Sequence, residues 1–283
     1  MPLMREVAII GAGELGGLLA HALARRDVAR HVRLIDETGR VAEGKALDIA
    51  QAGPVEAFAT RVSGSAELSD AAGASVIALA DRAAGGERSI DEQLLLLKQI
   101  VRLAPNTIVM CAGASERELV ERGVRELGRP ARGLFGSAPE ALAAAVRAMV
   151  ALEANGSPAD VALALAGIPP SHVMIPWEDA TIAGFAATRT LDEPARRRIQ
   201  SRTAALWPPG PHALAMAATK AIDAIAGRSR KLVSCFVGPD DSGGRRTRAA
   251  ALPVRLGPYG IAEMTMPRLD PRDRVALENA TLL

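Results

Sequence analysis

A glycine-rich turn close to the first residue constrains the fold of this chain more than any other feature. The apolar run at residues 7–10 leads directly into Gly11, Gly13 and Gly16, which have the spacing GxGxxG. Between a strand and a helix, the first glycine allows a tight turn, the second lets the backbone approach a pyrophosphate, and the third lets the helix pack closely on the strand. The sequence therefore predicts a βαβ unit whose helix N-terminus faces the phosphates of a dinucleotide.

An acidic residue lies at the distance that such a unit requires. Asp36 follows Gly16 by twenty residues and ends a second apolar run at residues 31–35. A carboxylate there can accept hydrogen bonds from the ribose hydroxyls of an adenosine, and its charge favours NAD over NADP. The structural alternative is a glycine turn that binds nothing. The predicted cofactor-binding residues are Gly11, Gly13, Glu14, Leu15, Gly16, Asp36 and Ala80.

The composition is that of a globular protein. Of 283 residues, 49% are hydrophobic, and no apolar run approaches the roughly 18 residues that cross a bilayer. The net charge is +2 with both signs interspersed, which argues against a nucleic-acid partner. Cys111 and Cys235 lie in apolar runs, so we expect buried thiols and no metal site. Met1 leads almost directly into the first strand, which predicts no signal peptide and a cytoplasmic protein.

Short β-rich runs alternate with helical stretches along the first half of the chain. This alternation predicts an α/β fold with a Rossmann-type doubly wound parallel sheet, and residues 133–136 complete its sixth strand. Beyond that point the sequence changes to a long Ala-rich helix followed by shorter strands and helices. We therefore predict a dinucleotide-binding domain at residues 1–136 and an α+β domain at residues 137–283.

Several scattered segments resemble the NAD-dependent malate and lactate dehydrogenase family. They are GKALDI at 44–49, QAGP at 51–54, GRPAR at 128–132 before LFG at 134–136, TIAG at 181–184 and LPVRLGPYG at 252–260. The resemblance covers nearly the whole chain. It implies NAD as cofactor, a substrate-type second domain, and a homodimer or homotetramer. It also implies hydride transfer to a 2-keto acid, with a histidine oriented by an aspartate as proton donor and arginines that bind the substrate.

The positions that the family uses for catalysis hold other residues in this chain. Gly-Ala-Ser at 113–115 replaces a substrate-binding asparagine, and a proline takes the place of the catalytic histidine. On the helix that follows residue 136, Leu142 and Ala145 replace the orienting aspartate and the carboxylate-binding arginine. In the loop after the fourth strand, Ala84 and Ile90 stand where two arginines are expected. Standard malate or lactate chemistry is therefore not expected.

Four residues are candidates for relocated catalytic roles. Arg82 and Arg88 each lie two residues from the expected loop positions, and their alternative role is that of solvated loop arginines. His172 lies about two residues beyond the family's histidine, where it could pair with Glu178 or Asp179 or lie on a loop rim. The fourth candidate, His212, follows a Pro-rich turn and is expected to start a helix whose family counterpart borders the substrate pocket.

Two hypotheses about function follow. The first is a pseudoenzyme that binds NAD, a related dinucleotide or another small anionic ligand. The alternative is an active NAD-dependent oxidoreductase with an altered 2-hydroxy or 2-keto acid substrate, which would use the relocated histidines and arginines. Glu14 and Asp81 lie near the predicted phosphate positions, where two carboxylates would weaken dinucleotide binding. The sequence leaves open whether the protein is an enzyme.

Overall fold

The computed structural model describes residues 4–84, 88–239 and 247–282. Residues 85–87, in the loop that carries Arg82 and Arg88, lie outside this range. The elements of the first half are β1 (Met4–Ile10), α1 (Glu14–Arg25), β2 (Ala29–Ile35), α2 (Gly39–Glu56), β3 (Arg61–Ser65), β4 (Val76–Leu79), α3 (Ile90–Leu103), β5 (Ile108–Cys111), α4 (Arg117–Leu127) and β6 (Leu134–Gly136).

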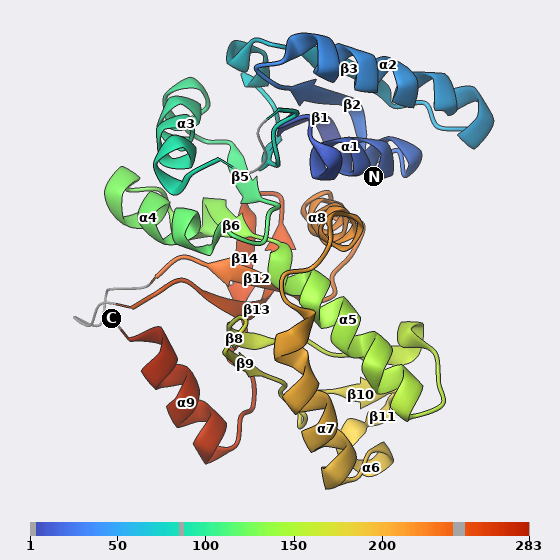
Figure 1. Ribbon diagram of the computed structural model, residues 1–283, viewed down its shortest axis with the longest axis vertical. Coiled ribbons are helices and arrows are strands. Elements are labelled where there is room, and N and C mark those ends of the chain that lie inside the picture. The colour runs from blue at the N-terminus through green and yellow to red at the C-terminus, as the bar shows by residue number, and fades with distance from the viewer. Residues whose placement is uncertain (1–3, 85–87, 240–246, 283) are drawn as a thin grey trace.

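The second half mixes helices with short strands (Figure 1). Its elements are α5 (Ala138–Glu153), β7 (Val161–Ala162), β8 (Ala166–Ile168), β9 (His172–Met174), β10 (Thr181–Ile182), β11 (Phe185–Ala186), α6 (Ala187–Thr190), α7 (Glu193–Thr203), α8 (Pro211–Ile225), β12 (Val233–Val237), β13 (Ala250–Gly257), β14 (Gly260–Met264) and α9 (Pro271–Thr281).

One long sheet forms the spine of the molecule. Its first six strands run in the order β3-β2-β1-β4-β5-β6 and pair in parallel. This order is that of a doubly wound dinucleotide-binding fold, so the predicted fold class is confirmed. The sheet continues through the antiparallel strands β12, β13, β8 and β9, and β14 pairs with β13. A separate small sheet joins β11, β10 and β7.

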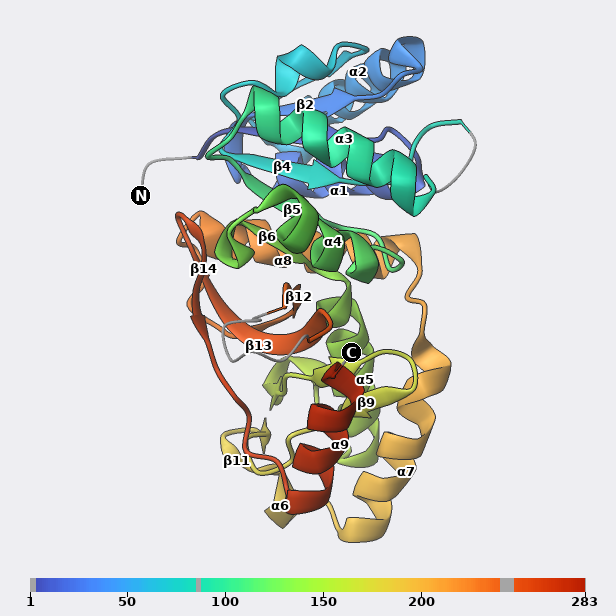
Figure 2. The ribbon, with the colours of Figure 1, turned by 90° about the vertical axis from the view of Figure 1, so that its left-hand side faces the viewer.

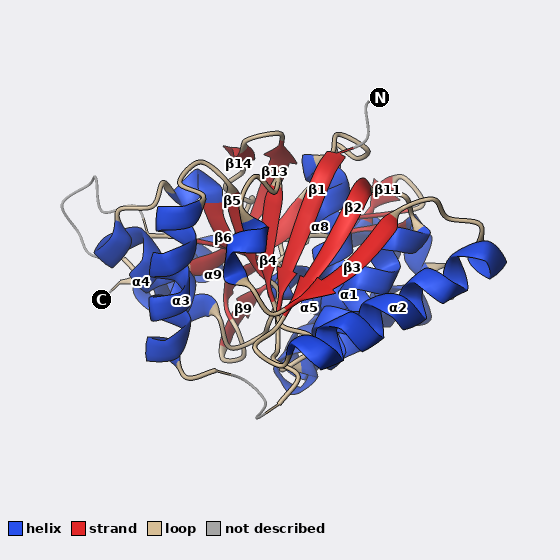
Figure 3. Cartoon of the chain, turned by 90° about the horizontal axis from the view of Figure 1, so that it is seen from above, coloured by secondary structure: helices blue, strands red, loops and turns tan. Residues whose placement is uncertain are grey.

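Helices cover both faces of the parallel part of the sheet. The helices α3 and α4 lie on one face, and α1 and α2 lie on the other (Figures 2 and 3). The strands β4 and β5 are buried at every residue, as expected for central parallel strands between two helical layers.

Cys111 and Cys235 are free and buried, as predicted, and burial raises the pKa of both thiols. In the described part of the chain, no helix is long and apolar enough to span a membrane.

The helix α2 is longer than the sequence pattern predicts. That pattern predicts a helix over residues 44–52, but the helix begins at Gly39 and ends at Glu56. Its buried stripe includes Ala42 near the start and Gly53 near the end. Both side chains are small and add little to an apolar periodicity, so the helix ends carry a weak sequence signal.

The two halves of the chain share the sheet and a helical contact. The strand β6 pairs in parallel with β5 and in antiparallel with β12, where Phe236 lies opposite Gly136. The helix α8 packs against α1, and a single hydrophobic core includes side chains from both helices. Because the sheet continues across residue 136, the domain division at 136 stays a prediction.

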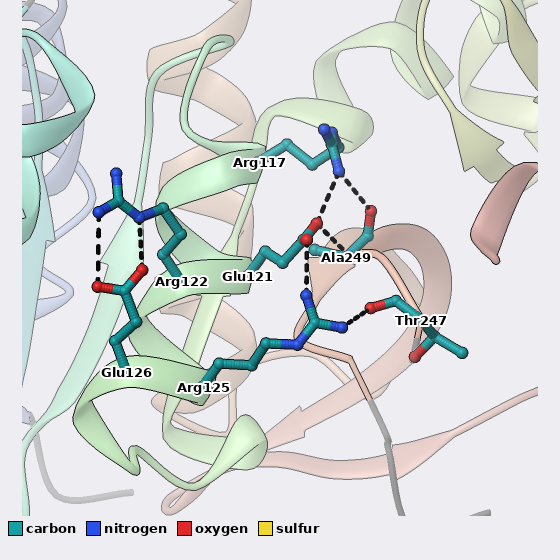
Figure 4. A network of polar contacts seen from close by, with 7 residues as sticks. All are labelled: Arg117, Glu121, Arg122, Arg125, Glu126, Thr247 and Ala249. Atoms are coloured by element: carbon teal, nitrogen blue, oxygen red, sulfur yellow. Dashed lines mark hydrogen bonds and ion pairs between the residues drawn. The ribbon is translucent and has the colours of Figure 1, made fainter. Parts of the chain in front are cut away.

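A polar network ties α4 to the chain that precedes β13 (Figure 4). The Glu121 carboxylate accepts hydrogen bonds from the Arg117 guanidinium at 3.0 Å, from Arg125 at 2.8 Å and from the Ala249 amide at 3.1 Å. Arg117 and Arg125 also donate to the carbonyl oxygens of Ala249 and Thr247, respectively. The Glu121 carboxylate thus connects α4, in the first half of the chain, to residues 247–249 in the second half.

Replacing Glu121 tests this connection. We expect Glu121→Gln to lower the free energy of unfolding by about 1–3 kcal/mol, because an amide cannot accept from three donors around a carboxylate that is only 13% exposed. Glu126→Gln is the matched control on the same helix, since its carboxylate is 46% exposed and pairs only with Arg122 among the described residues. It should cost less than about 1 kcal/mol in urea unfolding. Equal small losses for the two variants would contradict this role of Glu121.

Candidate nucleotide-binding site

The glycine turn joins β1 to α1 with very little space around its backbone. Gly11 has a φ of +119°, and a Cβ atom there would lie 2.4 Å from the Asp81 carbonyl oxygen. A Cβ atom on Gly16 would lie 2.0 Å from the Gly11 carbonyl oxygen. The tight turn and the close helix packing predicted from the GxGxxG spacing therefore require glycine at both positions.

Asp36 lies at the carboxyl end of β2 and is only 2% exposed. Its Oδ2 accepts hydrogen bonds from the amides of Ala12 at 2.8 Å and Ala83 at 2.9 Å, and its Oδ1 accepts from the Thr38 amide at 2.9 Å. Burial alone would raise the pKa of Asp36. The three backbone hydrogen bonds and the nearby Arg88 guanidinium outweigh burial, so the pKa lies below its usual value and the carboxylate is ionised at neutral pH.

The Asp81 carboxylate lies directly against the glycine turn. A Cβ atom on Gly13 would be 2.3 Å from the carboxylate carbon and Oδ2 of Asp81. The other oxygen, Oδ1, accepts a hydrogen bond from the Gly16 amide at 3.0 Å, and the Asp81 carbonyl accepts from the Gly13 amide at 2.9 Å. Gly13 is the N-cap of α1 and has no side chain that could cap the helix. Asp81 thus supplies the capping carboxylate from 65 residues away.

The other predicted cofactor residues lie around the same turn. Leu15 and Ala80 are buried, at 4% and 5% exposure, and Glu14 is exposed in the first turn of α1, where a carboxylate interacts favourably with the helix dipole. The sequence analysis missed Lys45, whose Nζ on α2 donates to the Gly13 carbonyl oxygen at 2.6 Å. Lys45 lies in the GKALDI segment at residues 44–49, which indicated the family resemblance. That segment does not predict a contact between Lys45 and the glycine turn.

The two candidate loop arginines lie in different surroundings. Arg88 is 7% exposed; it donates to the Ala80 carbonyl oxygen at 3.4 Å and lies 3.9 Å from the Glu37 carboxylate. Arg82 instead forms an ion pair with Glu92 at 3.7 Å. Only Arg88 is brought to the glycine turn.

A small cavity of about 20 Å³ lies beside Asp81 and Arg88. This volume holds about one water molecule. Sequence analysis missed Glu116, which lines the cavity, is 5% exposed and accepts a hydrogen bond from the Gly113 amide at 2.8 Å. Its position just after the carboxyl end of β5 could have revealed it, because parallel strands present their ligand-binding residues at that edge.

The two candidate histidines lie away from this cavity. His172 is the exposed first residue of β9 and lines a different surface cavity, beside α9. Of the alternatives for this residue, the structure shows no hydrogen bond from His172 to Glu178 or Asp179 among the described residues, and Asp179 accepts from Arg268 at 2.6 Å. His212 is exposed in the first turn of α8. No histidine is among the described residues that line the cavity at the glycine turn.

The helix α5 provides no substitute for the missing substrate-binding arginine. Leu142 is fully buried in the core of the second half. Arg147 donates to the Leu163 carbonyl oxygen at 2.9 Å and pairs with the buried carboxylate of Glu140. Glu140, which the sequence analysis missed, also accepts from Lys220 and from the Ser234 amide. Arg147 therefore belongs to a buried network of the second half.

Known proteins resemble this chain in sequence. Residues 5–115 match the lactate/malate dehydrogenase NAD binding domain. A malate dehydrogenase of Chloroherpeton thalassium is 27% identical over 96% of this chain and 94% of its own length. One from Thioalkalivibrio sulfidiphilus is 29% identical over 96% and 94%.

Solved structures share the fold over nearly the whole chain. The malate dehydrogenase of Salinibacter ruber has a TM-score of 0.83 at 23% identity and covers 98% of this chain and 94% of its own. The lactate dehydrogenase of Cryptosporidium parvum, complexed with lactic acid and nicotinamide adenine dinucleotide, has a TM-score of 0.87 at 19% identity, with 99% and 95% covered. The chain is thus similar to malate and lactate dehydrogenases over nearly its whole length, and its residues 5–115 match the NAD binding domain of that family.

Proposed function

We propose that this protein binds an NAD-type dinucleotide and does not turn over malate or lactate. The observation that carries the proposal is that Leu142, which stands at the position of the family's orienting aspartate, is fully buried in the core of the second half. The arginine nearest to the expected substrate-binding position, Arg147, is engaged by Glu140 and the Leu163 carbonyl oxygen. The glycine turn can bind the cofactor, but the positions of the family's proton-donating histidine, orienting aspartate and substrate-binding arginine hold other residues.

The size of the missing contributions supports this proposal. Removing a general acid or base usually lowers a rate by about 10²–10⁴. Losing a charge-assisted contact with a substrate carboxylate costs about 1.5–3 kcal/mol. The two effects are not additive when the residues act as a unit. Even so, the loss of proton donor, orienting aspartate and arginine together would reduce turnover of these substrates below a useful rate.

The residues present fit the adenosine side of NAD. The glycine turn leaves backbone amides at the N-terminus of α1, where a pyrophosphate is favoured, and the ionised carboxylate of Asp36 lies at the ribose position. Bound NAD supplies a hydride acceptor or donor. Asp81 opposes an anionic ligand at this turn by both its position and its charge.

The alternative is an active oxidoreductase with an altered substrate. Arg88 favours it, because its guanidinium lies beside the end of β4 at the glycine turn and would attract an anionic substrate. His172 and His212 do not favour it, because His172 lines a surface cavity beside α9 and His212 is exposed in the first turn of α8. The two proposals differ in one measurable property, namely turnover.

We expect no NADH oxidation above background with oxaloacetate, pyruvate or other 2-keto acids. A malate dehydrogenase assayed in parallel serves as the positive control, and a rise in melting temperature with NADH would show that the cofactor is bound. Turnover that disappears in Arg88→Ala or His172→Ala would contradict the proposal and support the altered-substrate enzyme.

The cofactor preference provides a second test. We expect NADH to bind at least tenfold more tightly than NADPH, because the 2′-phosphate would meet the buried, ionised carboxylate of Asp36. Isothermal titration of the same protein with both nucleotides measures the ratio. Equal affinities would show that Asp36 does not lie at the ribose.

We also propose that the protein is a cytoplasmic homodimer or homotetramer. Exposed apolar side chains on α2 support an assembly surface: Leu47 is 60% exposed and Val55 is 87% exposed. Sedimentation velocity should give at least twice the monomer mass of 29.5 kDa, and Val55→Lys should shift the protein toward the monomer. A monomer at micromolar concentration would overturn this proposal.

A further inference from the structure

The segment at residues 81–83, here called the strap, lies across the predicted nucleotide site. Its backbone contacts the glycine turn through the hydrogen bond from the Gly13 amide to the Asp81 carbonyl oxygen. Two further hydrogen bonds join side chains to the backbone: Gly16 donates to the Asp81 carboxylate, and Ala83 donates to the Asp36 carboxylate. The strap therefore touches both the turn and the acid at the ribose position.

The Asp81 carboxylate occupies the region that the family fold reserves for a pyrophosphate. A Cβ atom added to Gly13 would lie only 2.3 Å from the Asp81 Oδ2. The other carboxylate oxygen, Oδ1, accepts a hydrogen bond from the Gly16 amide in the first turn of α1. Amides at a helix N-terminus bind one anion well, because the donors and the helix dipole converge on a small region. A ligand phosphate and the Asp81 carboxylate therefore compete for the same donors.

The second contact of the strap affects the ribose position. The Asp36 Oδ2 already accepts from Ala12 and Ala83, while Oδ1 accepts from Thr38. A carboxylate oxygen accommodates about two hydrogen bonds, so Oδ2 has no capacity left while Ala83 is in place. Arg88 adds a further contact to this region through the Ala80 carbonyl oxygen, one residue before the strap.

We propose that Asp81 is a built-in anion which closes the nucleotide site in the free protein, so that a dinucleotide binds only when the strap moves away from Gly16 and Asp36. This inference rests on the proposed nucleotide-binding function. Because the open site is a minor state, the apparent affinity for NADH is reduced by the fraction of open molecules. Charge adds to this effect, since a carboxylate about 6 Å from a phosphate weakens binding by about threefold in water and about a hundredfold at an effective dielectric constant near 20.

The test compares NADH binding with the stability of the free protein in Asp81→Ala. This variant should bind NADH at least tenfold more tightly than the wild type in isothermal titration, because the competing anion is gone. Its free form should melt a few degrees lower, because α1 loses the carboxylate that caps Gly16. A residue with a purely structural role would lower the melting temperature without raising the affinity for NADH.

Two further variants separate position from charge. Asp81→Asn should bind NADH more tightly than the wild type but less tightly than Asp81→Ala, since the amide removes the charge and keeps the volume. Asp192→Ala is the matched control, because it removes the carboxylate that caps α7 in the second half through the Ala195 amide and should change NADH affinity less than threefold.

The outcomes distinguish this inference from the proposed function. If the wild type binds NADH and Asp81→Ala binds it no more tightly, the closed site is refuted while nucleotide binding stands. If neither protein binds NADH at millimolar concentration and both remain folded, the proposed function and this inference are both overturned.

Discussion

The close approach of three backbone segments at the carboxyl end of the parallel sheet determines what this site can hold. The Gly11 amide donates to the carbonyl oxygen at the end of β2, and the Gly13 amide donates to the Asp81 carbonyl oxygen after β4. Side chains at Gly11 or Gly16 would prevent this approach, because a Cβ atom at either position would overlap the backbone. Two carboxylates, Asp36 and Asp81, then accept hydrogen bonds from the amides of Ala12, Gly16 and Ala83.

The features of the first half that depend on local spacing were predictable from the sequence. The turn at Gly11 and Gly16, the strand that ends before Asp36 and the order of the parallel strands all follow from residue spacing and apolar alternation. The position of Asp81 was partly predictable, because β4 lies beside β1 in a doubly wound sheet of the dinucleotide-binding order 3-2-1-4-5-6. Its hydrogen bond to Gly16 was not, because the direction of a side chain in a loop depends on tertiary contacts that no local pattern records.

The second half was less predictable for the same reason. The pattern of α5 predicts a helix, but the pairing of Arg147 with Glu140 and the contact of Lys220 with that carboxylate join α5 to α8 across 80 residues. Sequence reasoning placed Arg147 off the expected face of the helix without revealing its partner. Similarly, His172 is near the right place in the sequence, yet the strand β9 directs it to the side of the sheet beside α9. Long-range packing therefore separates residues that the family pattern would bring together.

The central claim is that the Asp81 carboxylate stands at the glycine turn where we propose that a phosphate of NADH binds. A crystal structure of the protein with NADH tests it most directly. The account predicts that NADH occupies the glycine turn, with the Asp81 carboxylate displaced from the Gly16 amide and the hydrogen bond from Ala83 to Asp36 broken. NADH bound at the turn with both of these contacts intact would contradict it.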